Sequence, residues 1–136
     1  MFVVAIGAVL AVLATGQYSA YIDRAKVEAA KVDILLLEME IKRWRNNKNS
    51  LPPSLDSIGR GTMRDPWGRP YHYTDLTGPG NGAARKDKRL NPLNSDFDLF
   101  SAGKDGVFKK QVDNKDSLDD VIRARDGAFV DLASKF

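Results

Sequence analysis

The stretch Ala20–Arg45 reads AYIDRAKVEAAKVDILLLEMEIKRWR, without a single Gly or Pro and rich in strong helix formers. It predicts one long helix that ends near the polar run Asn46–Asn49, just before Pro52 and Pro53. Apolar residues recur along it at three- and four-residue spacing, the pattern of a helix with apolar faces.

Two apolar stripes run along this predicted helix. The first comprises Ile22, Ala25, Ala29, Val32, Leu36 and Met39, and the second comprises Val27, Ala30, Ile34, Leu37, Ile41 and Trp44. One stripe is enough to pack a helix onto its own domain. Two stripes indicate either a helix placed between its own domain and other subunits, or one thick core around the helix. We expect the second stripe to form the contact between subunits.

The sequence before this helix is apolar. Residues 1–14 are all apolar or Gly, and the first charged residue is Asp23. Crossing a bilayer takes about 20 apolar residues, so the segment is close to the minimum for a membrane span. No Lys or Arg precedes the run, which makes a cleaved signal peptide the weaker interpretation. Tyr18 and Tyr21 stand where the apolar run ends, as interfacial anchors often do.

After residue 50 the periodicity changes. Ser54 is a candidate cap for a short helix through Ile58, which Gly59 would end. Strand-like alternation appears in residues 70–74, 96–100 and 128–132. The segments between the three predicted strands are read as loops, residues 77–92 and 103–125. The predicted fold class is therefore α+β, with one long N-terminal α-helix packed on a small antiparallel β-sheet.

Composition narrows the function classes. The 136 residues include 21 Lys and Arg against 18 Asp and Glu, and the two signs are interspersed, so we expect no nucleic-acid partner. There is no Cys, and His72 is the only histidine, so thiolate sites are excluded and a catalytic triad would rest on one residue. We expect no enzymatic activity.

An acidic loop is the best candidate for a metal site. Within sixteen residues it holds Asp105, Asp113, Asp116, Asp119 and Asp120. Calcium takes six to eight hard oxygen ligands, which carboxylates and free carbonyls of such a loop can supply. The spacing is not that of an EF-hand. A solvated acidic loop is the alternative that composition alone favours.

Three other features have structural interpretations. Asp65–Gly68 is predicted to form a turn with Trp67 as an apolar anchor in the core. His72 is predicted to be an ordinary strand residue. The basic run Arg85–Arg89 is predicted to be a mobile, solvated loop.

Several segments, taken in order, carry a family resemblance. They are Gln17–Lys31, Leu51–Leu55, Arg64–Tyr73 (RDPWGRPYHY), Asp96–Gly106 (DFDLFSAGKDG) and Asp119–Ile122. The first is similar to the helix of all type IV pilin-like proteins and is moderately specific. The third and fourth, in this order, resemble the major pseudopilins of type II secretion specifically. Together the segments span nearly the whole chain.

The resemblance implies a structural subunit of a periplasmic pseudopilus that supports type II protein secretion. Its copies polymerise as a helical homo-oligomer through the N-terminal helix, with minor pseudopilins and an inner-membrane assembly platform as partners. Residues 1–20 would be the half of the helix embedded in the membrane or in the filament core. Residues 21–136 would be a periplasmic head. In the family, the positions matching Asp105, Asp119 and Asp120 bind Ca²⁺, together with a carbonyl that we place at Ala102.

The chain departs from the family pattern in three places. The cleavage signal and the early glutamate are missing, and Met1 aligns a few residues past them, as though the start were truncated or misassigned. Gly16 replaces the usual proline. The stretch Asp105–Asp119 is longer than in many relatives.

Two other functions stay open. A type IV pilus subunit, serving adhesion, motility or DNA uptake, would have the same architecture and a basic stripe along the filament. A monomeric, membrane-tethered binding domain would instead bury one helix stripe and carry a concave pocket with perturbed titratable groups.

Overall fold

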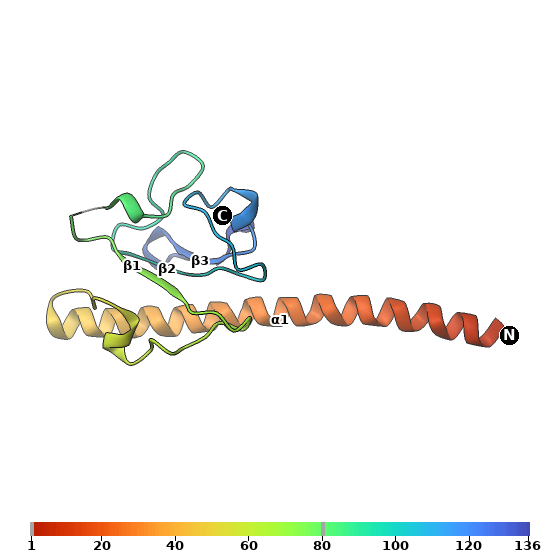
Figure 1. Ribbon diagram of the computed structural model, residues 1–136. Coiled ribbons are helices and arrows are strands. Elements are labelled where there is room, and N and C mark those ends of the chain that lie inside the picture. Colours follow the sequence, from red (N-terminus) through yellow and green to blue (C-terminus); the bar gives the residue numbers. More distant parts are fainter. Residues whose placement is uncertain (1, 80) are drawn as a thin grey trace.

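A computed structural model describes residues 2–79 and 81–136. Met1, in the expected membrane-embedded segment, and Gly80, in the expected loop 77–92, lie outside the described residues. One long helix runs along one side of a small antiparallel sheet, which confirms the α+β class (Figure 1).

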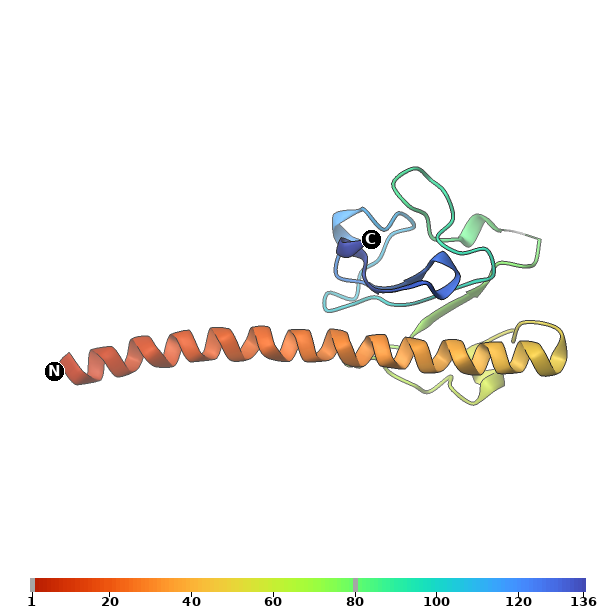
Figure 2. The ribbon, with the colours of Figure 1, turned by 180° about the vertical axis from the view of Figure 1, so that it is seen from behind.

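Helix α1 spans Phe2–Lys48, and its N-terminal half projects beyond the rest of the protein (Figures 1 and 2). It ends where the sequence predicts. Asn49 takes a left-handed conformation with φ of 54°, which Asn tolerates better than most residues, and its N–H donates to the Arg45 carbonyl.

The sheet has four antiparallel strands in the order β1-β2-β3-β4. They are β1 (His72–Asp75), β2 (Phe97–Ser101), β3 (Val121–Ala124) and β4 (Phe129–Leu132). The three predicted strands are confirmed to within two residues. Strand β3 lies inside the segment 103–125 that the sequence predicts as a loop, so that prediction was wrong. All four of its residues are buried, and their sequence, VIRA, does not alternate between apolar and polar residues.

Among the described residues there are also five short 3₁₀ helices. They are η1 (Leu55–Ile58), η2 (Asn81–Ala83), η3 (Lys115–Ser117), η4 (Arg125–Gly127) and η5 (Ala133–Lys135). The first is the short helix that the sequence predicts, and Gly59 ends it with φ of 72°.

The main core lies between α1 and the sheet. Ala30, Ile34, Leu37 and Ile41 are fully buried there, in one cluster with Phe97 and other residues of the sheet. The expectation that this stripe meets other subunits was therefore wrong. The physical reason is that the inner face of the sheet is itself apolar and is buried against this side of α1.

The opposite face of α1 is uncovered. Val32, Leu35 and Met39 are 63%, 50% and 54% exposed, and Ala25 and Ala29 are exposed beside them. This face corresponds to most of the first predicted stripe, with Leu35 added. We call Ala25, Ala29, Val32, Leu35 and Met39 the outer helix face.

A second core cluster covers the other face of the sheet. It comprises Leu93, Phe100, Val112, Ile122, Ala124 and Ala133, with Phe129 packed against it. Segments before β2, with Leu93, and after it, with Val112 and Ala133, thus form a third layer over the sheet.

Candidate functional site

The N-terminal part of α1 is apolar and uncovered. Its large apolar residues Val3, Val4, Ile6, Val9, Leu10, Val12 and Leu13 are all exposed. The helix is long and apolar enough to cross a membrane by length and composition. The outer helix face continues this apolar surface alongside the head, and a shallow groove of about 520 Å³ borders it at Leu35 and Met39.

The acidic loop is positioned by residues of the segments Arg64–Tyr73 and Asp96–Gly106. Asp65 Oδ1 accepts hydrogen bonds from the N–H groups of Trp67 and Arg69 at 3.0 and 2.9 Å, which closes the turn. Its Oδ2 accepts from the Ser101 hydroxyl at 2.6 Å, and Ser101 Oγ in turn accepts from Gly103 N–H. Trp67 packs against the main core, which confirms its predicted role as an apolar anchor.

The Arg69 side chain holds the start of the acidic loop through hydrogen bonds to its backbone. Its Nη1 donates to the carbonyls of Gly103 at 2.8 Å and of Lys104 at 3.2 Å. Gly106 has φ of 73° and lies so close to the Arg69 side chain that a Cβ atom would collide with it. These carbonyls therefore already have a positively charged partner from the chain.

Asp105 and Asp119 lie next to each other at the surface. The Asp105 N–H donates to Asp119 Oδ2 at 2.9 Å, and Asp105 Oδ1 accepts from Val107 N–H. Gly103, with φ of 65°, is in tight contact with the Asp119 backbone. The Ala102 carbonyl, close by in the chain, accepts from Gly106 N–H at 3.2 Å.

Asp120 points into the head instead. It is fully buried, and its Oδ2 accepts a hydrogen bond from Arg85 Nη2 at 2.6 Å. The Arg85 guanidinium lies 4.2 Å from the centre of the Phe100 ring. Burial raises the pKa of Asp120 to about 7, against the opposing effect of Arg85, and the charge of Asp119 adds to the rise.

The basic run is therefore not a solvated loop as a whole, and that prediction was wrong for Arg85, which is buried. Lys86 pairs with Pro92 and Gln111 in isolated bridges. Asp87 accepts from the Asn91 side-chain amide and from the N–H groups of Asn91 and Arg89. These hydrogen bonds fix the turn and lower the Asp87 pKa. The burial of Arg85 has no local sequence signal, because its partner Asp120 lies in a distant segment.

The oxygen atoms fit a hard cation only in part. Across residues 2–79 and 81–136, no three His, Cys, Asp or Glu side chains come together closely enough to hold a metal ion. Asp105 and Asp119 adjoin, whereas Asp120 faces Arg85, and its buried Oδ1 has no hydrogen-bond partner among the described residues. Arg85 occupies only Oδ2 of Asp120, so the unpartnered Oδ1 is the oxygen of this side chain that is left for a cation.

Comparison with known family models, curated proteins and solved structures finds no match to this chain.

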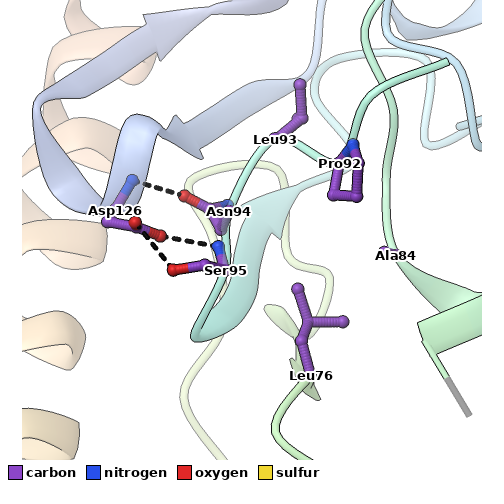
Figure 3. Close-up of a pocket in the computed structure, with 7 residues that line it drawn as sticks. All are labelled: Leu76, Ala84, Pro92, Leu93, Asn94, Ser95 and Asp126. Carbon is purple, nitrogen blue, oxygen red and sulfur yellow. Dashed lines mark hydrogen bonds between the residues drawn. The ribbon is translucent and has the colours of Figure 1, made fainter.

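One hollow, of about 450 Å³, lies beside the turn after β3 (Figure 3). It is lined by Leu76, Ala84, Pro92, Leu93, Asn94, Ser95 and Asp126. The Asp126 carboxylate accepts from the N–H and the hydroxyl of Ser95, and Asn94 Oδ1 accepts from Asp126 N–H. These polar groups are hydrogen-bonded to one another, so they join the turn at Asp126 to the loop that contains Asn94 and Ser95.

His72 is the strand residue that the sequence predicts. It lies in β1, half-buried, and its ring stacks on Phe100 with the ring centres 4.8 Å apart. Burial lowers its pKa, and Arg85 adds to the effect.

Proposed function

We propose that this protein is a membrane-anchored filament subunit of the kind that its motifs resemble, a major pseudopilin of type II secretion. The observation that carries the proposal is the outer helix face, an apolar surface on the side of α1 that the head leaves uncovered. Soluble monomers rarely leave a long apolar helix surface exposed, so such a surface usually meets a membrane or a partner.

A second copy of the chain fits this surface best. The outer helix face continues the apolar N-terminal half of the same helix, so one straight rod offers apolar contact both in a bilayer and in a bundle of identical helices. A contact between different surfaces of identical subunits does not close on itself and yields a helical filament. The head would then decorate the outside of the filament.

In this proposal the N-terminal half lies in the bacterial inner membrane before assembly, and the head lies in the periplasm. Minor pseudopilins and an inner-membrane assembly platform are the further partners that the resemblance implies. The test is to place a photo-cross-linking amino acid at position 35 of the full chain, where we expect it to join copies of the chain to one another.

We also propose that Ca²⁺ stabilises the acidic loop, held by Asp105, Asp119 and the Ala102 carbonyl, with Asp120 joining through its unpartnered Oδ1. The ion would supply positive charge between carboxylates that otherwise repel. Asp119 is the residue to test, because its carboxylate is at the surface and already borders Asp105.

Calcium is expected to raise the melting temperature of the full chain in detergent, and chelation to lower it. Binding to the folded form alone adds about 2.7 kcal/mol at a hundredfold excess over Kd. Asp119→Ala should melt like the chelated protein and ignore calcium, while Asp113→Ala serves as the matched acidic control. Identical melts with calcium and with chelator would contradict the calcium proposal and leave the filament proposal untouched.

A further inference from the structure

The loop after β2, residues Gly103–Lys110, contacts α1 at Asp23. Lys104 Nζ forms an ion pair with Asp23 Oδ2 at 2.9 Å. In both views this loop is the part of the head that reaches furthest toward the N-terminal half of α1 (Figures 1 and 2). This loop therefore lies beside Asp23 of α1.

Asp23 marks the boundary of the charge-free part of α1. An α-helix rises 1.5 Å per residue, so the twenty residues before Asp23 span about 30 Å, the thickness of the hydrocarbon core of a bilayer. Tyr18 and Tyr21 are exposed just before it. When α1 crosses a membrane, Asp23 and its partner Lys104 thus lie at the layer of the lipid headgroups.

The loop has the side chains that suit this layer. Val107 and Phe108 are 45% and 40% exposed, and Lys104, Lys109 and Lys110 stand around them, also exposed. Four acidic groups lie at the same loop. Asp23 pairs with Lys104, and Asp116 lies 3.9 Å from Lys109 Nζ. Asp105 accepts from Val107 N–H, and Asp119 accepts from Asp105 N–H. Exposed apolar groups flanked by lysines favour binding to a bilayer, where anionic headgroups cover an apolar acyl region.

The loop is also held in shape before any contact. Arg69 donates to the carbonyls of Gly103 and Lys104, and the Asp105 N–H donates to Asp119. Phe108 packs on His72 and Phe100, with ring centres 4.5 and 4.9 Å away. Because the loop is already ordered, it loses little conformational entropy when it contacts another surface, and this favours binding.

We propose that the loop Gly103–Lys110 docks on the headgroup layer of the bilayer that holds α1, and that anionic lipid strengthens this contact. Val107 and Phe108 face the apolar boundary, and the three lysines face the headgroups. This inference rests on the proposed membrane anchorage. It describes the subunit before it enters a filament, with its head seated on the membrane through this loop.

The chain has no Cys, so a single one can be added and labelled with a polarity-sensitive fluorophore. The test uses the full chain in lipid nanodiscs of phosphatidylcholine, with or without phosphatidylglycerol, and brominated lipids as quenchers. The labelled variants are Val107→Cys, Val9→Cys in the apolar half of α1, and Leu90→Cys. Leu90 is 58% exposed and belongs to the outermost loop of the head, on the side away from α1 (Figure 1).

We expect strong quenching at position 9, clear quenching at position 107 and almost none at position 90. Quenching at 107 should increase with phosphatidylglycerol and fall several-fold when Lys109→Glu and Lys110→Glu are added. Quenching at 9 with none at 107 would overturn the docking and leave the anchorage intact. No quenching at position 9 would overturn the anchorage itself.

Discussion

Leu35→Asp is expected to abolish filament assembly while the head stays folded. Leu35 lies on the outer helix face and is half-exposed in the single chain, so the change costs the fold less than about 1 kcal/mol. In a filament the same position would be covered by another copy. A carboxylate buried there without a partner costs several kcal/mol at every contact. The measurement is the count of filaments seen by electron microscopy in cells that make the full chain.

Ile34→Asp is the matched control, because Ile34 is the residue before Leu35 and its side chain lies in the core between α1 and the sheet. It is fully buried against the sheet, so this variant should lose its folded head and be degraded. Normal filaments from Leu35→Asp would show that the outer helix face is not the contact. A stable, folded Ile34→Asp would contradict the packing of α1 on the sheet.

Arg123→Ala is expected to destabilise the head by about 3–5 kcal/mol, the typical cost of removing one partner from a buried ion pair. Arg123 is buried in β3, and its Nε donates to Glu38 Oε1 of α1 at 3.0 Å. Its two Nη atoms donate to the Asp96 carboxylate at 2.8 and 2.9 Å, and Nη1 also donates to the Phe97 carbonyl. Removing the guanidinium leaves two carboxylates short of their partner and loosens α1 from the sheet.

The measurement is urea unfolding of the full chain in a mild detergent, followed by the fluorescence of Trp44 and Trp67. Arg125→Ala is the control, since its guanidinium lies at the surface, 5.1 Å from the centre of the Phe136 ring. That variant should change the free energy of unfolding by less than about 1 kcal/mol. Equal stability of the two variants would mean that the buried network does not join α1 to the sheet.

Sequence patterns predict those elements whose signal is local. The absence of Gly and Pro from Ala20 to Arg45 predicts α1, and alternation predicts β1, β2 and β4. Strand β3 carries no such signal, because both of its faces are covered and an arginine interrupts its apolar residues. That arginine is tolerated only because Glu38 and Asp96, from distant segments, surround it.

The sequence also could not predict which stripe of α1 is covered. Both stripes are apolar, and the choice depends on how the sheet docks, which is a long-range property. The same holds for the candidate site. The family resemblance groups Asp105 with Asp119 and Asp120, but the ion pair with Arg85 holds Asp120 inside the head. A buried arginine in a run of lysines has the same sequence signature as a solvated one.

The most direct test of the central claim is site-specific photo-cross-linking in cells that make the full chain. A photo-reactive amino acid replaces Leu35 on the outer helix face, and in a parallel strain it replaces Leu90 on the outermost loop. Polymerisation through the outer helix face predicts a ladder of products at multiples of the mass of the chain from position 35, and far fewer products from position 90. Monomer alone at position 35, or equal ladders from both positions, would contradict it.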